Sequence, residues 1–145
     1  MRLHKQVRPD VYIGPQPTMD QLYEARYVGI RTVIDFRVPG ETAIPNALLN
    51  SNVGLSYINI PVPMERLQVR SVDQLDTAMA LMPGPYLLHC STGQRAAALF
   101  LASQARRHGW TRQNTLAEMA AIGFGIEDAR RLTEFACDIA VPDFP

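Results

Sequence analysis

The chain has 145 residues, of which 47% are hydrophobic and 19% are charged, and this length and composition predict a single globular domain covering residues 1–145. Its 14 Lys and Arg residues balance its 14 Asp and Glu residues, so the formal net charge is zero. Such a protein has no global field that attracts nucleic acid or an anionic membrane. We therefore expect neither as a partner, and we expect any anion-binding site to be local.

The ends and apolar runs of the chain bear on its location. Residues 1–9 carry basic side chains with no apolar stretch behind them, which does not match a signal peptide. The longest apolar run, residues 96–102, is too short to cross a bilayer. The sequence thus predicts a cytoplasmic protein without a membrane segment.

The cysteines and histidines do not predict a disulfide or a metal site. In a reducing cytoplasm we expect Cys90 and Cys137 to remain thiols. The three histidines are scattered along the chain and form no ligand-spaced cluster with the cysteines. They are His4, His89 and His108.

The N-terminal half of the chain alternates between strand and helix patterns. Residues 11–13, 32–36 and 55–60 are rich in β-branched and aromatic side chains and predict short strands. Thr18 and Gln21 have the spacing of a capping box, which predicts a helix that Gly29 ends. Residues 38–52 are rich in Pro, Gly and Asn and predict a long loop with one helical turn at 47–49.

The C-terminal half continues this alternation. Residues 71–74 repeat the capping-box pattern and predict the start of a helix, and residues 86–89 predict a strand. The helix that follows is apolar on all sides over its first two turns, which predicts a buried helix in the middle of the domain. Two more helices are expected, at 111–121 and 127–140. The whole pattern predicts an α/β fold with a small, mostly parallel sheet flanked by helices on both faces.

The candidate catalytic residues lie in the segment 89–95, His-Cys-Ser-Thr-Gly-Gln-Arg, between a predicted strand and the buried helix. The first amides of a helix lack intrahelical partners and carry the positive end of its dipole, so they bind anions. Gly93 allows the backbone to curl until these amides converge, and a cysteine at their focus, Cys90, is favoured as a thiolate. Arg95 can fold back and offer two parallel N–H groups to a phosphoryl group. The pattern predicts a reactive cysteine in an anion-binding loop.

Cys90, Cys137 and His89 also have purely structural interpretations. A single cysteine is more often a small buried hydrophobic residue, but the combination of Cys90, Gly93 and Arg95 at a strand-to-helix junction favours catalysis. Cys137 lies on the apolar face of the last predicted helix, where we expect it to pack in the core. We expect His89 to be a residue at the end of a strand and not a general base.

The His-Cys-x-x-Gly-x-Arg loop resembles that of the protein-tyrosine and dual-specificity phosphatase superfamily. The segments at 13–18, 29–37 and 39–41 resemble the bacterial beta-lactamase hydrolase-like phosphatase family in particular. The resemblance implies a dual-specificity-phosphatase-like fold, a cysteinyl-phosphate intermediate, no cofactor, and a phosphorylated small molecule or phosphoprotein as substrate. It also implies roles for individual residues. Cys90 would be the nucleophile, Arg95 the phosphate clamp, Ser91, Thr92, Gly93 and Gln94 the source of backbone amides, and Gln16 and Arg37 part of the rim.

The loop departs from the superfamily in two ways. The stretch from Cys90 to Arg95 is one residue shorter than in most cysteine phosphatases, and this also resembles the rhodaneses, which carry a persulfide on the cysteine. Ala96 stands where Ser or Thr often helps the thiolate to leave, and Thr92 is the available substitute.

A general acid is expected on a loop upstream of the cysteine. Glu65, in the loop 61–66 after a predicted strand, is the candidate. Asp73 is the alternative, although its position in the first turn of a helix is explained by interaction with the helix dipole.

Three functions are compatible with the sequence. The leading hypothesis is hydrolysis of a phosphate monoester through Cys90. The alternatives are a rhodanese-like sulfurtransferase that forms a persulfide on Cys90, and a non-catalytic module that binds phosphate in the same loop. The loops 38–52 and 61–70 would shape the pocket, so the sequence predicts neither the particular substrate nor the oligomeric state.

Overall fold

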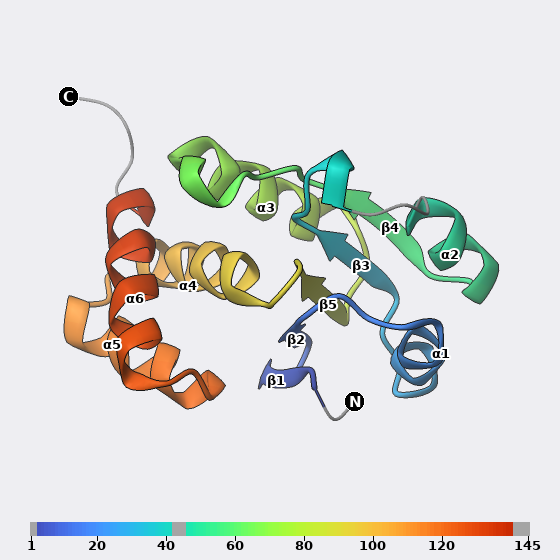
Figure 1. Cartoon of the computed structure of the whole chain (residues 1–145), viewed down its shortest axis with the longest axis horizontal. Coiled ribbons are helices and arrows are strands. Elements are labelled where there is room, and N and C mark those ends of the chain that lie inside the picture. The colour runs from blue at the N-terminus through green and yellow to red at the C-terminus, as the bar shows by residue number, and fades with distance from the viewer. Residues whose placement is uncertain (1–2, 42–45, 141–145) are drawn as a thin grey trace.

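The computed structural model in Figure 1 describes residues 3–41 and 46–140 and has a five-stranded sheet at its centre. The edge strand β1 (Lys5–Arg8) runs antiparallel to β2 (Val11–Gly14), and the other neighbouring strands are parallel. The strands in spatial order are β1 (Lys5–Arg8), β2 (Val11–Gly14), β5 (Tyr86–His89), β3 (Thr32–Asp35) and β4 (Ser56–Asn59). The predicted α/β fold with a mostly parallel sheet is confirmed.

The register of the sheet determines where a site can form. His89 at the end of the central strand β5 pairs with Gly14 of β2 on one side and with Asp35 of β3 on the other. Asp35 in turn pairs with Asn59 of β4. All four parallel strands therefore end at one edge, where the segments that follow them come together, as is usual for ligand sites in open α/β sheets.

The helices cover both faces of the sheet. Val33 and Leu87 point into a core shared with α1 and α2, whereas Ile34 and Leu88 point into a larger core shared with α3, α4 and α6. Figure 1 shows α4, α5 and α6 on one side and α1 and α2 on the other. Their bounds are α1 Met19–Tyr27, α2 Asn46–Val53, α3 Val69–Leu81, α4 Gln94–His108, α5 Arg112–Ile122 and α6 Ile126–Ala140.

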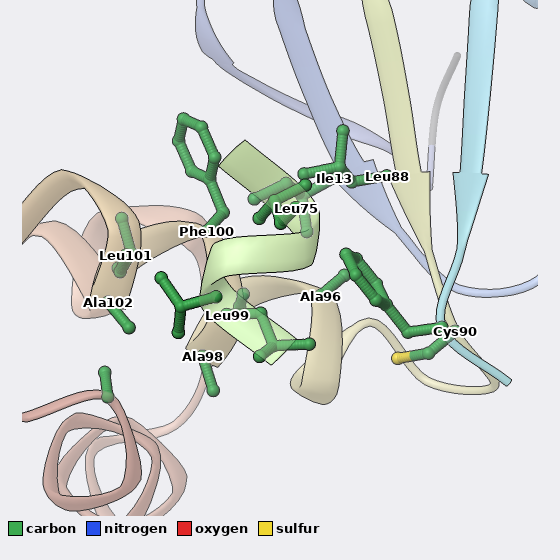
Figure 2. Close-up of a cluster of buried hydrophobic side chains, with 14 of the residues drawn as sticks. Ile13, Leu75, Leu88, Cys90, Ala96, Ala98, Leu99, Phe100, Leu101 and Ala102 are labelled. Atoms are coloured by element: carbon green, nitrogen blue, oxygen red, sulfur yellow. The ribbon is translucent and has the colours of Figure 1, made fainter. Parts of the chain in front are cut away.

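Helix α4 is the buried central helix that the sequence predicts. Every residue from 95 to 105 is buried, because the sheet, α3, α5 and α6 surround it. Figure 2 shows Leu99, Phe100 and Leu101 of this helix among the buried side chains, with Cys90 beside its first turn. The helix is thus anchored at all sides, and its N-terminus is fixed at the edge of the sheet. None of the described helices is long and apolar enough to cross a membrane.

Three local predictions need correction. Helix α3 begins at Val69 and not at Ser71, because Gln68 is its N-cap residue and the Ser71 N–H already donates to the Gln68 carbonyl oxygen. Helix α2 runs for eight residues where the sequence predicts one turn, and residues 42–45 of the predicted loop lie outside the described residues. Strand β1 was not predicted, because an edge strand that is largely exposed has no hydrophobic pattern.

Candidate active site

The loop between β5 and α4 curls around the sulfur of Cys90. Gly93 is the N-cap residue of α4, and its φ of +91° lies in the left-handed region that glycine tolerates. A Cβ atom on Gly93 would also lie 3.1 Å from the carbonyl carbon of Gly14. The Gly93 N–H donates a hydrogen bond to Cys90 Sγ at 3.2 Å, and the Cys90 side chain is buried. The sulfur is therefore at the floor of the loop, at the N-terminus of α4.

Arg95 folds back over this loop and is held there by four hydrogen bonds. Its Nη1 donates to Glu41 Oε1 at 2.6 Å and to the Val62 carbonyl oxygen at 3.0 Å. Its Nη2 donates to Glu41 Oε2 at 2.5 Å and to Ser91 Oγ at 3.2 Å. Hydrogen bonding to Glu41 raises the pKa of Arg95, and the neighbouring Cys90 sulfur raises it further. The structure thus brings together the two residues that the sequence pairs as nucleophile and clamp.

Glu41 is a member of the site to which sequence reasoning gave no role. It lies at the end of a short 3-10 helix (Pro39–Glu41) after β3, and its carboxylate also accepts hydrogen bonds from Ser91 Oγ at 2.5 Å and from the Val38 N–H at 2.9 Å. The Arg95 hydrogen bonds are the main reason why the pKa of Glu41 falls to about 2. Glu41 is therefore a carboxylate at any physiological pH and serves as the counter-charge of Arg95. The sequence signal that could have identified Glu41 is that it lies in the segment 39–41, which resembles the bacterial phosphatase family.

Arg37 lies inside the protein and not on the rim. Its side chain is 1% exposed and forms a bidentate pair with Asp35, through Nε to Oδ1 and Nη2 to Oδ2, both at 3.0 Å. Asn46 and Tyr57 donate further hydrogen bonds to Asp35 Oδ2. A buried carboxylate needs a partner of opposite charge, and Asp35 at the end of β3 draws Arg37 inward for this reason. The resemblance implies that Arg37 lines the rim of the loop, whereas its side chain is buried against Asp35.

His89, directly before the cysteine, is also buried. Its Nδ1 is 3.8 Å from Asp35 Oδ1 and has no hydrogen-bond partner among the described residues. Burial lowers the pKa of His89 to about 4 and outweighs the attraction of Asp35. The ring is therefore neutral at neutral pH and is enclosed at the end of the strand, which does not suit a general base.

The remaining predicted binding residues surround the loop in different ways. The backbone N–H of the exposed Gln16 donates to the Ser91 carbonyl oxygen at 3.3 Å, so the turn after β2 contacts the loop. Thr92 is exposed at the tip of the loop. The side chain of Gln94 accepts a hydrogen bond from Arg131 of α6 at 2.9 Å. What Gln94 can offer to the loop is therefore its backbone N–H, at the first residue of α4.

The two candidate general acids lie in different parts of the molecule. Glu65 is exposed in the short 3-10 helix Met64–Arg66, and this loop adjoins the site because Val62 accepts a hydrogen bond from Arg95. Asp73 is paired with Arg106 at 2.8 Å, near the other end of α4. At 1.5 Å per residue, Arg106 is about 16 Å along the helix from Arg95. Asp73 therefore lies near the C-terminal end of α4, whereas Cys90 lies at the N-terminal end of this helix.

These contacts define a class of site. A cysteine sulfur lies where an amide, a helix N-terminus and an arginine converge, which is an arrangement for binding an oxyanion next to a nucleophile. No group of three or more His, Cys, Asp and Glu side chains within residues 3–41 and 46–140 is arranged to hold a metal ion.

Comparison with protein families assigns the chain. Residues 4–107 match the family model described as "Beta-lactamase hydrolase-like protein, phosphatase-like domain", and the chain belongs to this family. The resemblance drawn from the sequence is confirmed. The beta-lactamase hydrolase-like protein of Xylella fastidiosa is 29% identical over 99 residues, which are 63% of this chain and 22% of that protein. The chain therefore spans about a fifth of the length of this curated relative.

Solved structures show the same fold. A candidate phosphatase from Neisseria meningitidis has a TM-score of 0.77 at 23% identity, with 94% of this chain and 99% of that chain covered. TpbA of P. aeruginosa, crystallised in complex with phosphotyrosine, has a TM-score of 0.71 at 20% identity, with 95% of this chain and 90% of that chain covered. At these identities the likeness concerns the fold.

The pair of Glu41 and Arg95 predicts a specific dependence of stability on pH. The pKa of Glu41 is lowered from 4.5 to about 2, so its stabilising effect is complete above about pH 4.5 and is lost as the pH falls toward 2. Glu41→Gln should lower the thermal unfolding midpoint at neutral pH. The difference from the wild-type protein should shrink as the pH falls through this window.

The control for this measurement is Glu118→Gln. The Glu118 carboxylate forms a partly exposed pair with Arg8 at 3.5 Å, and such a pair contributes little. A midpoint difference for Glu41→Gln that stays constant between neutral pH and pH 3 would contradict the assigned role of the charge pair.

Proposed function

We propose that this chain hydrolyses phosphate monoesters through a covalent intermediate on Cys90. The observation that carries the proposal is that the Gly93 amide donates to the Cys90 sulfur at the N-terminus of α4, while the Arg95 guanidinium folds over the same loop onto Ser91. In the first step the thiolate attacks phosphorus, so that an S–P bond forms and the bond to the ester oxygen breaks. In the second step water attacks phosphorus, and inorganic phosphate and the thiolate are released.

The charges of the loop suit both steps. Negative charge on the phosphoryl oxygens would be stabilised by the first amides of α4, by the positive end of its dipole and by Arg95. A guanidinium has five N–H donors, and the four on Nη1 and Nη2 are bound to Glu41, Val62 and Ser91. Its Nε–H has no acceptor among the residues that the structure describes and remains for a phosphoryl oxygen. A second oxygen would replace Ser91 on Nη2, since that hydrogen bond, at 3.2 Å, is the longest of the four.

The leaving oxygen needs a proton when the ester is an alkyl phosphate. We propose Glu65 as its source, because the loop that carries it adjoins Arg95 through Val62. A phosphorylated small molecule or a phosphoprotein is the proposed substrate, and the complex of TpbA with phosphotyrosine lends support to the second.

One observation favours a different chemistry. The loop from Cys90 to Arg95 is one residue shorter than is usual for cysteine phosphatases, and a tighter ring of amides suits a persulfide. Ala96, with no hydroxyl to help the thiolate leave, is also compatible with an oxyanion-binding module that does not turn over. Membership of the phosphatase-like family supports hydrolysis over both.

The identity of the nucleophile and clamp is tested by three substitutions. Cys90→Ser should abolish hydrolysis of para-nitrophenyl phosphate, and Arg95→Lys should lower kcat/KM by about a hundredfold or more, because the charge remains but the planar pair of donors is lost. Cys137→Ser is the matched control, since this second thiol lies on α6 away from the loop, and it should retain activity. Vanadate should inhibit the wild-type protein.

Two assays separate the three functions. Thiocyanate formed from thiosulfate and cyanide by wild-type protein but not by Cys90→Ser, without phosphate release, would replace the phosphatase by a sulfurtransferase. Silence in both assays together with binding of a phosphopeptide would instead establish a binding module. Near-normal turnover by Arg95→Lys would remove Arg95 from its proposed role.

The role of Glu65 is tested with two leaving groups. Glu65→Gln should slow the hydrolysis of an alkyl phosphate by about a hundredfold, and should change para-nitrophenyl phosphate hydrolysis little, because nitrophenolate leaves without a proton. Its kcat for the alkyl ester should also lose the decline at high pH. Asp73→Asn serves as the comparison and should leave both rates unchanged. An equal loss for both substrates would assign Glu65 to binding, and no loss would exclude it as the acid.

A further inference from the structure

His4 is buried although it lies near the start of the chain, and the proposed reaction does not use it. It directly precedes β1, and its side chain is enclosed, with the residue 3% exposed. Its Nε2 donates a hydrogen bond to the Pro15 carbonyl oxygen at 2.8 Å. Its Nδ1 is buried without a hydrogen-bond partner among the described residues. A polar ring held in this way needs a structural or functional explanation.

The ring of His4 lies against Gly14 and leaves no room there for a side chain. A Cβ atom on Gly14 would be 2.4 Å from His4 Cδ2, 2.8 Å from His4 Cγ and 2.9 Å from the backbone Cα atom of His4. The pairing of Lys5 with Ile13 in the antiparallel β1–β2 ladder brings the two residues opposite each other. Because Gly14 has an ordinary φ, the restriction comes from the contact with His4 and not from backbone strain.

Gly14 in turn lies against the Cys90 loop. A Cβ atom on Gly93 would be 3.1 Å from the Gly14 carbonyl carbon, so these two backbones are in contact. Two residues further on, the Gln16 N–H donates to the Ser91 carbonyl oxygen at 3.3 Å. The turn formed by residues 14–16 therefore contacts the loop at both Ser91 and Gly93, while His4 contacts the same turn at Gly14 and Pro15.

We propose that His4 is a positioning residue for the Cys90 loop. Its ring holds the turn 14–16 against Ser91 and Gly93, and thereby fixes the curl in which the loop amides face a bound oxyanion. The ring supplies the packing surface against Gly14, and Nε2 supplies the donor that keeps the Pro15 carbonyl oxygen in place. This inference rests on the oxyanion site of the proposed function, but it does not require turnover.

The test uses the full chain with His4→Ala and Gly14→Ala. His108→Ala is the matched control, because His108 is at the far end of α4, stacked on Trp110. The probes are inorganic vanadate, measured by its binding, and iodoacetamide, measured by its rate of alkylation of Cys90 in a Cys137→Ser background. Thermal unfolding midpoints identify variants that are folded at the assay temperature.

We expect His4→Ala and Gly14→Ala each to weaken vanadate binding by about tenfold or more and to slow the alkylation of Cys90, because small displacements of a binding group have large effects. His108→Ala should change neither.

A folded His4→Ala variant with wild-type vanadate affinity and alkylation rate would overturn the proposal. If His4→Ala does not fold, Gly14→Ala, which retains the ring, decides by the same two readouts. Failure of the proposed function has a different signature. In that case wild-type protein would hydrolyse no phosphate ester, while His4→Ala would still slow the alkylation of Cys90.

Discussion

The loop after β5 has to turn from the central strand into a buried helix within a few residues, and it does so through Gly93 with a φ of +91°. A side chain at this position would be strained by the backbone and would also meet the carbonyl carbon of Gly14. The end of β2 thus lies directly against the loop at Gly14. Gly14 cannot carry a side chain either, because His4 occupies the space next to it. The remaining geometry depends on this contact: it places the Gly93 N–H on the Cys90 sulfur and aligns the first turn of α4 behind it.

The charges around the loop follow from the same arrangement. At the edge of the sheet two arginines are each neutralised by a carboxylate, Arg95 by Glu41 and the buried Arg37 by Asp35. In the proposed function, the attraction for an oxyanion then depends on the amides at the N-terminus of α4 and on the Nε–H donor of Arg95. The proposed oxyanion site is therefore a local one, as expected for a chain with zero formal net charge.

The sequence predicted the parts of the molecule that depend on local patterns. A strand, a small-residue loop and a helix apolar on every side lie next to each other in the chain, so the positions of Cys90 and Arg95 at a strand-to-helix junction could be predicted. Glu41 could not be paired with Arg95 in this way, because 54 residues separate them and the pairing depends on the order of the strands. The burial of Arg37 has the same cause, since it requires Asn46 and Tyr57 to complete the surroundings of Asp35. Strand β1 has no hydrophobic pattern, because an edge strand buries few side chains. The burial of His4, which directly precedes β1, could not be predicted for the same reason.

The most direct test is to trap the phosphoryl group on the protein during turnover. Wild-type protein is mixed with para-nitrophenyl phosphate, quenched within a turnover, digested and mapped by mass spectrometry, with Cys90→Ser treated in parallel. A phosphoryl group on the sulfur of Cys90, absent from the serine variant and lost when turnover is allowed to finish, is the predicted result. Phosphate release by wild-type protein with no phosphoryl group on Cys90 at any quench time, or an added sulfur atom on Cys90 in its place, would contradict the covalent mechanism.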